Sequence, residues 1–168
     1  MCIIIDANTL GRVFNQKSTE HEEFEPVLNW ILNGRGKFVI GGSKYMREIG
    51  AKYLGLFSEF GKVNKAVKVD NQLVNDMEIW AAAQVNDIDF DDPHLVALLL
   101  VSKCKLICSL DKRAYPFFTH KTFFPPGIDK PKIYSRKSNS DLLIDGNIAA
   151  ICKPVKKLTV KEREGLIN

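Results

Sequence analysis

The sequence of 168 residues lacks a long hydrophobic run. Its longest apolar stretch, residues 95–101, is far shorter than the roughly 20 residues that a membrane-spanning helix needs. A second short run, residues 3–5, is followed at once by Asp6, which does not fit the apolar region of a secretory signal. We therefore expect a cytoplasmic protein that does not bind membranes.

Cysteine is also scarce. Cys2, Cys104, Cys108 and Cys152 are too few for a disulfide scaffold in a chain of this length. Cys104 and Cys108 lie four residues apart, but no second pair of cysteines or histidines with metal-binding spacing accompanies them. We expect these cysteines to be buried free thiols.

The sequence contains neither an internal repeat nor a linker rich in Gly or Ser, and its 45% hydrophobic and 26% charged residues are typical of a globular domain. Positive charge is concentrated near the end. Residues 1–111 contain 12 Lys and Arg against 15 Asp and Glu, whereas residues 112–168 contain 12 against 5. Aromatic residues are interspersed among these cations, a pattern that favours a nucleic-acid partner. A solvated basic surface accounts for the pattern nearly as well.

Short apolar runs alternate with stretches of helical periodicity, which predicts an α/β fold with a mostly parallel central sheet flanked by helices. Thr159 and Glu162 have the spacing of a capping box and predict a short final helix, while Ser43 is the expected N-cap of an earlier one. The expected strands are residues 2–5, 37–40, 66–69, 105–109 and 132–134. The main expected helices are residues 24–32, 44–60, 72–85 and 94–103, with a short helix after Asp111.

Four acidic residues stand where a parallel sheet would gather them. Asp6 and Asp111 follow expected strands, Asp92 precedes a helix that begins with Pro93, and Glu48 lies in the first turns of the helix after Ser43. Sites in open parallel sheets form at the carboxyl ends of strands. Carboxylates gathered there repel one another unless a hard cation such as Mg²⁺ or Mn²⁺ is bound.

Each of these acids has an ordinary explanation when it is considered alone. Asp92 is then a helix N-cap, Asp111 a turn residue and Glu48 a solvated helix residue, whereas Asp6 directly follows a buried strand and is harder to dismiss. His94 could meet a phosphate at the helix start, but we expect an exposed or capping histidine.

The four acids lie in motifs that together resemble those of PIN domain nucleases. Residues 6–10 (DANTL) resemble the opening Asp-x-Asn-x-Leu of that family, and residues 43–49 (SKYMREI) resemble its second motif, in which a Glu follows a Ser by five residues. Residues 92–98 are similar to the Asp-x-x-apolar-x-Ala-x start of the third motif. Asp111 follows 19 residues later, after an apolar strand and a Ser. The resemblance covers roughly residues 2–118.

This resemblance implies a PIN-like three-layer fold and hydrolysis of RNA phosphodiester bonds. The implied catalytic and metal-binding residues are Asp6, Glu48, Asp92 and Asp111, with Mg²⁺ or Mn²⁺ as the cofactor. The neighbouring Asp91 could replace Asp92, but Asp92 keeps both the motif and the distance to Asp111.

Other residues are assigned supporting roles by the same resemblance. Asn8 and Ser109 match positions that hold the acids through hydrogen bonds. RNA would be held outside the acidic site by cations, for which the candidates are Lys112, Arg113, Arg136 and Lys137, although an unspecific basic turn explains the first two equally well.

We expect residues 1–135 to form the nuclease domain and residues 136–168 a basic extension packed on or beside it. Size and family analogy favour a toxin-type endoribonuclease controlled by a protein antitoxin. The alternatives are a housekeeping or defence-associated nuclease of the same fold, with DNA as a further candidate substrate, and a PIN-like interaction module without catalysis. The sequence does not decide whether the protein forms a homo-oligomer.

Overall fold

The computed structural model describes residues 2–167 and contains a five-stranded parallel sheet with the strand order β3-β2-β1-β4-β5. The register pairs Ile3 with Phe38, Ile5 with Cys108, and Cys108 with Tyr134. The strands are β1 Cys2–Ile5, β2 Lys37–Ile40, β3 Ala66–Lys68, β4 Leu106–Cys108 and β5 Lys132–Tyr134. The predicted α/β class with a parallel sheet is confirmed, and each strand lies where an apolar run predicts one.

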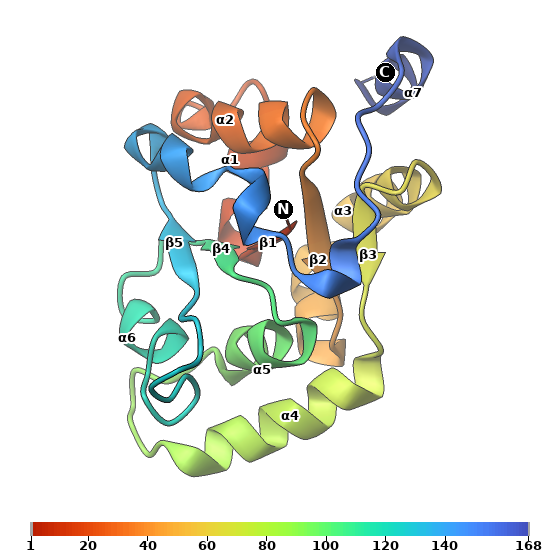
Figure 1. Cartoon of the computed structure of the whole chain (residues 1–168). Helices are drawn as coiled ribbons and strands as arrows, with labels where there is room; N and C mark the ends of the chain where they lie inside the picture. The colour runs from red at the N-terminus through yellow and green to blue at the C-terminus, as the bar shows by residue number, and fades with distance from the viewer. Residues whose placement is uncertain (1, 168) are drawn as a thin grey trace.

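Helices cover both faces of this sheet (Figure 1). α1 and α2 lie on one face, and α4, α5 and α6 lie on the other. The helices are α1 Leu10–Phe14, α2 His21–Leu32, α3 Ser43–Lys62, α4 Asn71–Gln84, α5 Pro93–Ser102, α6 Tyr115–Phe118 and α7 Val160–Ile167. Short 3₁₀ segments are η1 Ala7–Thr9, η2 Lys137–Leu142, η3 Asp145–Asn147 and η4 Ala150–Cys152.

The core explains why the central strands are almost wholly apolar. All residues of β1 and β4 are at most 1% exposed, as expected for strands covered on both faces. α5 is apolar on nearly every side and is buried from His94 to Leu99. On the opposite face, Phe14 of α1 and Phe57 of α3 pack against Phe38 of β2, with ring centroids 4.5–5.8 Å apart. The sheet therefore forms a rigid base for residues that follow its strands.

α3 begins differently from the prediction. Gly42 is the N-cap and Ser43 is already helical, so the assignment of Ser43 as the N-cap is wrong. Gly42 has a φ of 87°, a left-handed conformation that glycine adopts without steric cost. Two side chains of α4 take over the capping: Asn71 accepts from the Gly42 amide and Asn75 from the Ser43 amide. The α3 terminus is thereby fixed to α4.

α3 is also interrupted at Gly50, which has a φ of 68° and a ψ of 168°. These angles lie outside the range that residues with a side chain adopt readily, so the single helix expected for residues 44–60 is divided into two parts. The first part carries Tyr45 and Glu48, and the second packs Phe57 and Phe60 into the core. The interruption separates the part of α3 near the acids from the part that stabilises the sheet.

Residues 136–168 pack against the main domain through several contacts. Lys37 at the start of β2 donates to the Pro154 carbonyl oxygen at 2.7 Å, and Arg163 donates to Asn33 after α2 at 2.6 Å. The predicted capping box is confirmed, because the Thr159 and Glu162 side chains each accept a hydrogen bond from the other residue's backbone amide. The extension therefore crosses the amino ends of β1 and β2, the edge opposite the acids.

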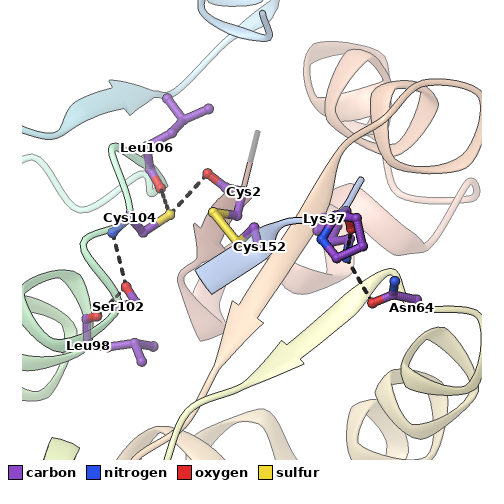
Figure 2. The surroundings of a disulfide bond; sticks show 9 residues. Cys2, Lys37, Asn64, Leu98, Ser102, Cys104, Leu106 and Cys152 are labelled. Carbon is purple, nitrogen blue, oxygen red and sulfur yellow. Dashed lines mark hydrogen bonds between the residues drawn. A yellow bond between two sulfur atoms is a disulfide. The ribbon is translucent and has the colours of Figure 1, made fainter. Parts of the chain in front are cut away.

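A disulfide bond joins this extension to the first strand (Figure 2). Cys2 and Cys152 have Cα atoms 6.2 Å apart, a separation that suits a disulfide, and both are fully buried. The prediction of free thiols is wrong for this pair and confirmed for Cys104 and Cys108. Burial raises the pKa of both remaining thiols to about 12, so they stay protonated and unreactive.

Within residues 2–167, none of the helices combines the length and apolar character needed to cross a membrane. The disulfide bears on the expected compartment as well, because such bonds are rare in reducing compartments. The cytoplasmic location therefore stays a prediction.

Candidate metal centre

Asp6 lies at the point where the strand order of the sheet reverses. The connections after β1 and after β4 run over opposite faces of the sheet, so the crevice between the carboxyl ends of these two neighbouring strands is a topological switch point. The Asp6 amide extends the ladder by donating to the Cys108 carbonyl oxygen at 2.9 Å. The Asp6 side chain is thus placed in this crevice by the sheet itself.

The Asp6 carboxylate is only 5% exposed, and this burial raises its pKa. Ser109, the first residue after β4, donates from Oγ to Asp6 Oδ2 at 2.7 Å. The Asn8 amide donates to Asp6 Oδ1 at 3.3 Å. Both contacts lower the Asp6 pKa and so oppose the effect of burial. The two residues predicted to support the acids therefore contact the carboxylate expected to need them.

Two further hydrogen bonds position the end of β1. The buried Tyr45 of α3 donates to the Ile5 carbonyl oxygen at 2.7 Å, and Thr9 of η1 donates to the Asp6 carbonyl oxygen at 2.8 Å. Both donors are fully buried, so water does not compete for these oxygens. The backbone around Asp6 is therefore not free to move, because the carbonyl oxygens of Ile5 and of Asp6 each accept a buried hydrogen bond.

Asp111 follows β4 by three residues and already has a cationic partner. Its amide donates to Ser109 Oγ at 3.1 Å, and its carboxylate accepts from the Arg113 guanidinium, with Nη2 2.9 Å from Oδ2. This hydrogen bond from Arg113 lowers the Asp111 pKa. Arg113 Nη2 also lies 3.3 Å from Asp91 Oδ2. The side chain predicted to contact RNA is therefore engaged with two acids.

Asp92 precedes α5 and occupies its N-cap position, yet its side chain makes no capping hydrogen bond there. Its pKa is raised to about 6, mainly by burial and then by the charges of Asp6 and Asp91. The Asp92 side chain is 24% exposed, compared with 48% for Asp91. Asp91 contacts Arg113, and Asp92 alone of the two also lies beside Glu48 and His94. The choice of Asp92 as the ligand stays a prediction.

Glu48 reaches the same region from the first part of α3. Its side chain is 35% exposed, and partial burial raises its pKa, with Asp6 adding to the rise and Lys44 opposing it. Lys44 donates to the Asp91 carbonyl oxygen at 2.9 Å. The lysine thus links the start of α3 to the segment before α5 and brings positive charge toward Glu48 and Asp92.

The sequence prediction for His94 is wrong. It was expected to be exposed or to cap the helix, but it is fully buried in α5. Nε2 lies 2.9 Å from Glu48 Oε2, and Nδ1 lies 3.8 Å from Asp92 Oδ1. Burial lowers its pKa to about 3, so the ring is neutral. The available signal was the helix itself, because a polar residue in a helix that is apolar on every side is buried.

Asp92 belongs to both groups of metal-ligand side chains found in this region. Potential ligand atoms of Glu48, Asp92 and His94 lie within 4.8 Å of one another, and so do those of Asp91, Asp92 and Asp111. Asp6 lies outside both groups, although its charge raises the pKa of Glu48 and of Asp92. The ligand atoms of Glu48, Asp92 and Asp111 thus fall into two overlapping groups, and the charge of Asp6 affects the other acids from outside these groups.

The remaining predicted residues surround this edge. Lys112 and Arg136 are exposed, and neither forms an ion pair within residues 2–167. Lys137 instead turns toward α2, with Nζ 3.3 Å from Glu22 Oε1 and its amide bonded to Glu23. Asn8 is exposed beside Asp6. Of the four predicted RNA-binding cations, two are therefore engaged with acidic side chains.

Comparisons of the chain with protein-family models, with curated proteins and with solved structures give no match. The resemblance to PIN domain nucleases therefore rests on the four sequence motifs and on the arrangement of their acids at the switch point. Membership of that family stays a prediction.

Proposed function

We propose that this protein is a metal-dependent endoribonuclease of the PIN type. The observation that carries the proposal is the position of Asp92 between Glu48 and Asp111 at the switch point of a parallel sheet, with Asp6 near enough for its charge to raise the pKa of Glu48 and of Asp92. Burial and mutual repulsion raise the pKa of three of these acids, which is the cost that a bound divalent cation would remove.

The donor set fits Mg²⁺ or Mn²⁺, since both prefer carboxylate oxygens and retain waters. When bound, such an ion would lower the pKa of a coordinated water, so that hydroxide is available to attack a phosphodiester, and would neutralise the charge on the leaving oxygen. The protein's own contribution is orientation. Ser109 donates to one oxygen of Asp6 and also accepts from the Asp111 amide, so it orients both acids.

RNA is the proposed substrate, held by cations around the acidic edge. Of the four predicted cations, Lys112 and Arg136 are exposed and form no ion pair with the described residues, so they can contact phosphate. Arg113 becomes available once a metal ion replaces it beside Asp111. Lys137 would first have to leave Glu22. An electrostatic arrangement of this kind favours binding of a polyanion over a neutral substrate.

We place the protein among toxin-type enzymes, in which a protein antitoxin would control the site. This part of the proposal rests on chain length and on family analogy. A housekeeping or defence-associated nuclease with the same chemistry is the alternative, and DNA cleavage in the experiment below would favour it.

A second candidate function is a PIN-like interaction module without catalysis. The favouring observation is the contact of Arg113 with Asp111 and Asp91, because a built-in guanidinium already neutralises part of the acidic edge. In such a module Arg113 would stay in place when Mg²⁺ or Mn²⁺ is added.

The test is RNA cleavage by the Asp6→Asn variant in the presence of MgCl₂ or MnCl₂. Asn keeps the shape and removes the ligand charge, so cleavage is expected to fall by orders of magnitude while circular dichroism shows an intact fold. The matched control is Asp141→Asn, which changes an exposed carboxylate far from the switch point in sequence. Cleavage by Asp6→Asn at the wild-type rate, or wild-type cleavage that persists in EDTA, would rule out the metal-dependent nuclease.

A further inference from the structure

His94 differs from the other histidines of the chain in what its ring contacts. Neither of its ring nitrogens has a hydrogen-bond partner among the described residues, although the side chain is 1% exposed. His21 Nδ1 is paired with the Arg12 carbonyl oxygen at 2.8 Å, and His120 Nδ1 accepts from the Thr122 amide at 3.3 Å. Buried polar groups nearly always have partners, so the two nitrogens of His94 require an explanation.

The ring of His94 points at acids. Nε2 lies 2.9 Å from Glu48 Oε2, but the contact does not have the angles of a hydrogen bond. Two ligand atoms bound to one metal ion at right angles, each about 2.1 Å from it, are about 3 Å apart. The distance between Nε2 and Oε2 therefore suits two atoms that share an ion.

The other ring nitrogen, Nδ1, also lies near a carboxylate. Its distance of 3.8 Å from Asp92 Oδ1 is too long for a hydrogen bond but puts a carboxylate beside this nitrogen as well. Metal-binding histidines usually direct their second nitrogen toward a carboxylate or a carbonyl oxygen, which fixes the ring. The ring is also held by its place in α5, where the neighbouring Leu95 and Val96 are buried as well.

We propose that His94 is a metal ligand that binds through Nε2 beside Glu48 and Asp92, and that it makes the site select Mn²⁺ over Mg²⁺. The inference rests on the metal site of the proposed function and adds a nitrogen ligand to its oxygen set. Imidazole nitrogen binds transition-metal ions better than it binds Mg²⁺, which strongly prefers oxygen. The second group, Asp91, Asp92 and Asp111, offers oxygen alone and is partly neutralised by Arg113.

The first test is titration of the full chain with MnCl₂ and with MgCl₂ in an isothermal calorimeter. Wild-type protein is expected to bind Mn²⁺ at least about tenfold more tightly than Mg²⁺. His94→Gln is expected to lose at least about tenfold in Mn²⁺ affinity and to change little toward Mg²⁺. His120→Gln is the matched control and should bind both ions as the wild type does. Equal Mn²⁺ affinity in the wild type and in His94→Gln would overturn the proposal.

A second measurement keeps the inference testable if His94→Gln fails to fold. Pulsed electron paramagnetic resonance of Mn²⁺ bound to the wild-type chain detects a directly coordinated ¹⁴N nucleus. We expect this coupling, and its absence would overturn the role of His94.

The two proposals can fail separately. A wild-type chain that shows ¹⁴N coupling but does not cleave RNA would remove the nuclease and keep the metal site. A chain that cleaves RNA in an Asp6-dependent manner, without ¹⁴N coupling, would keep the nuclease and remove His94 from the metal.

Discussion

Ser109 Oγ donates a hydrogen bond to Asp6 Oδ2 at 2.7 Å, although the two residues are 103 positions apart in the chain. The same oxygen accepts the amide of Asp111 at 3.1 Å. One buried hydroxyl therefore connects the acid that follows β1 with the acid that follows β4. Ser109 therefore helps to set the positions of both acids.

The first prediction concerns this hydroxyl. Ser109→Ala removes the hydrogen bond to Asp6 and leaves the Asp111 amide without its acceptor, so Mn²⁺ affinity is expected to fall about 10- to 100-fold. Calorimetric titration with MnCl₂ measures the change, and Ser138→Ala, at an exposed position, is the control. A dissociation constant equal to that of the wild type would show that Ser109 does not orient the site.

The second prediction separates two adjacent acids. Asp92→Asn is expected to abolish RNA cleavage, because Asp92 belongs to both groups of potential ligands. Asp91→Asn is expected to weaken cleavage only slightly, because Asp91 is more exposed and contacts Arg113. Cleavage rates of the two variants at saturating MnCl₂ decide between them. The reverse order of rates would make Asp91 the ligand.

The third prediction concerns RNA binding. Replacing both Lys112 and Arg136 with Ala is expected to weaken binding of single-stranded RNA and to reduce the slope of log K against log salt by about 0.7 for each lost phosphate contact. Binding is measured with Asp6→Asn as the background, so that RNA stays intact. Lys17→Ala is the control for an exposed lysine elsewhere. An unchanged slope would place the RNA contacts on other residues.

The fourth prediction follows from a buried lysine on the opposite edge of the sheet. Lys65 is fully buried and donates to the carbonyl oxygens of Gly34 and Gly36. Burial, with the nearby charge of Lys37, lowers its pKa to about 8 from the ordinary value of 10.5. Below pH 8 the amine is protonated in both the folded and the unfolded chain, and the folded state bears the full cost of the buried charge.

Between pH 8 and 10.5, Lys65 loses its proton in the folded state while the unfolded state keeps it. Its contribution to the free energy of unfolding therefore rises with pH across this window, by about 3 kcal/mol in total. Urea unfolding of the wild type and of Lys65→Met from pH 7.5 to 10.5 isolates the effect from other titrating groups. A difference between the two proteins that is independent of pH would contradict the prediction.

The fifth prediction concerns the disulfide. Cys2 and Cys152 are 150 positions apart, and a bond that closes so long a loop restricts the unfolded chain strongly. Cys152→Ser is expected to lower the free energy of unfolding by about 3–5 kcal/mol in urea. Dithiothreitol should lower the stability of the wild type toward that of the variant and leave the variant unchanged. Equal urea midpoints without reductant would show that the bond does not form in the protein.

The strands and most helices could be predicted because their signals are local. Residues 2–5 and 38–40 are continuous apolar runs, and both lie in buried parallel strands. The convergence of Asp6 and Asp111 was also predictable, because acids that follow neighbouring parallel strands reach the same edge. Arg113 could be recognised as a cation near the site, but its contacts with Asp111 and Asp91 depend on the conformation of the turn.

The features that could not be predicted depend on contacts between distant segments. Nothing near Cys2 indicates that Cys152 will lie beside it, since the pairing requires the extension to cross the sheet. Ser43 has the chemistry of an N-cap, but Gly42 takes that position because Asn71 of α4 supplies the capping oxygen. The burial of His94 is different, because the apolar character of α5 indicates it, and only the contact of His94 with Glu48 depends on a distant segment.

The bond between Cys2 and Cys152 turns most of the polypeptide into a covalent ring. The segment between α4 and α5 lies within this ring, and its Ile88 is 97% exposed, as protease-sensitive sites usually are. A single cut there would open the backbone without releasing a fragment, because the pieces on either side of residue 88 would still be joined through sulfur. The nicked protein would separate into two chains only after reduction, with the two strand-end acids Asp6 and Asp111 on different pieces.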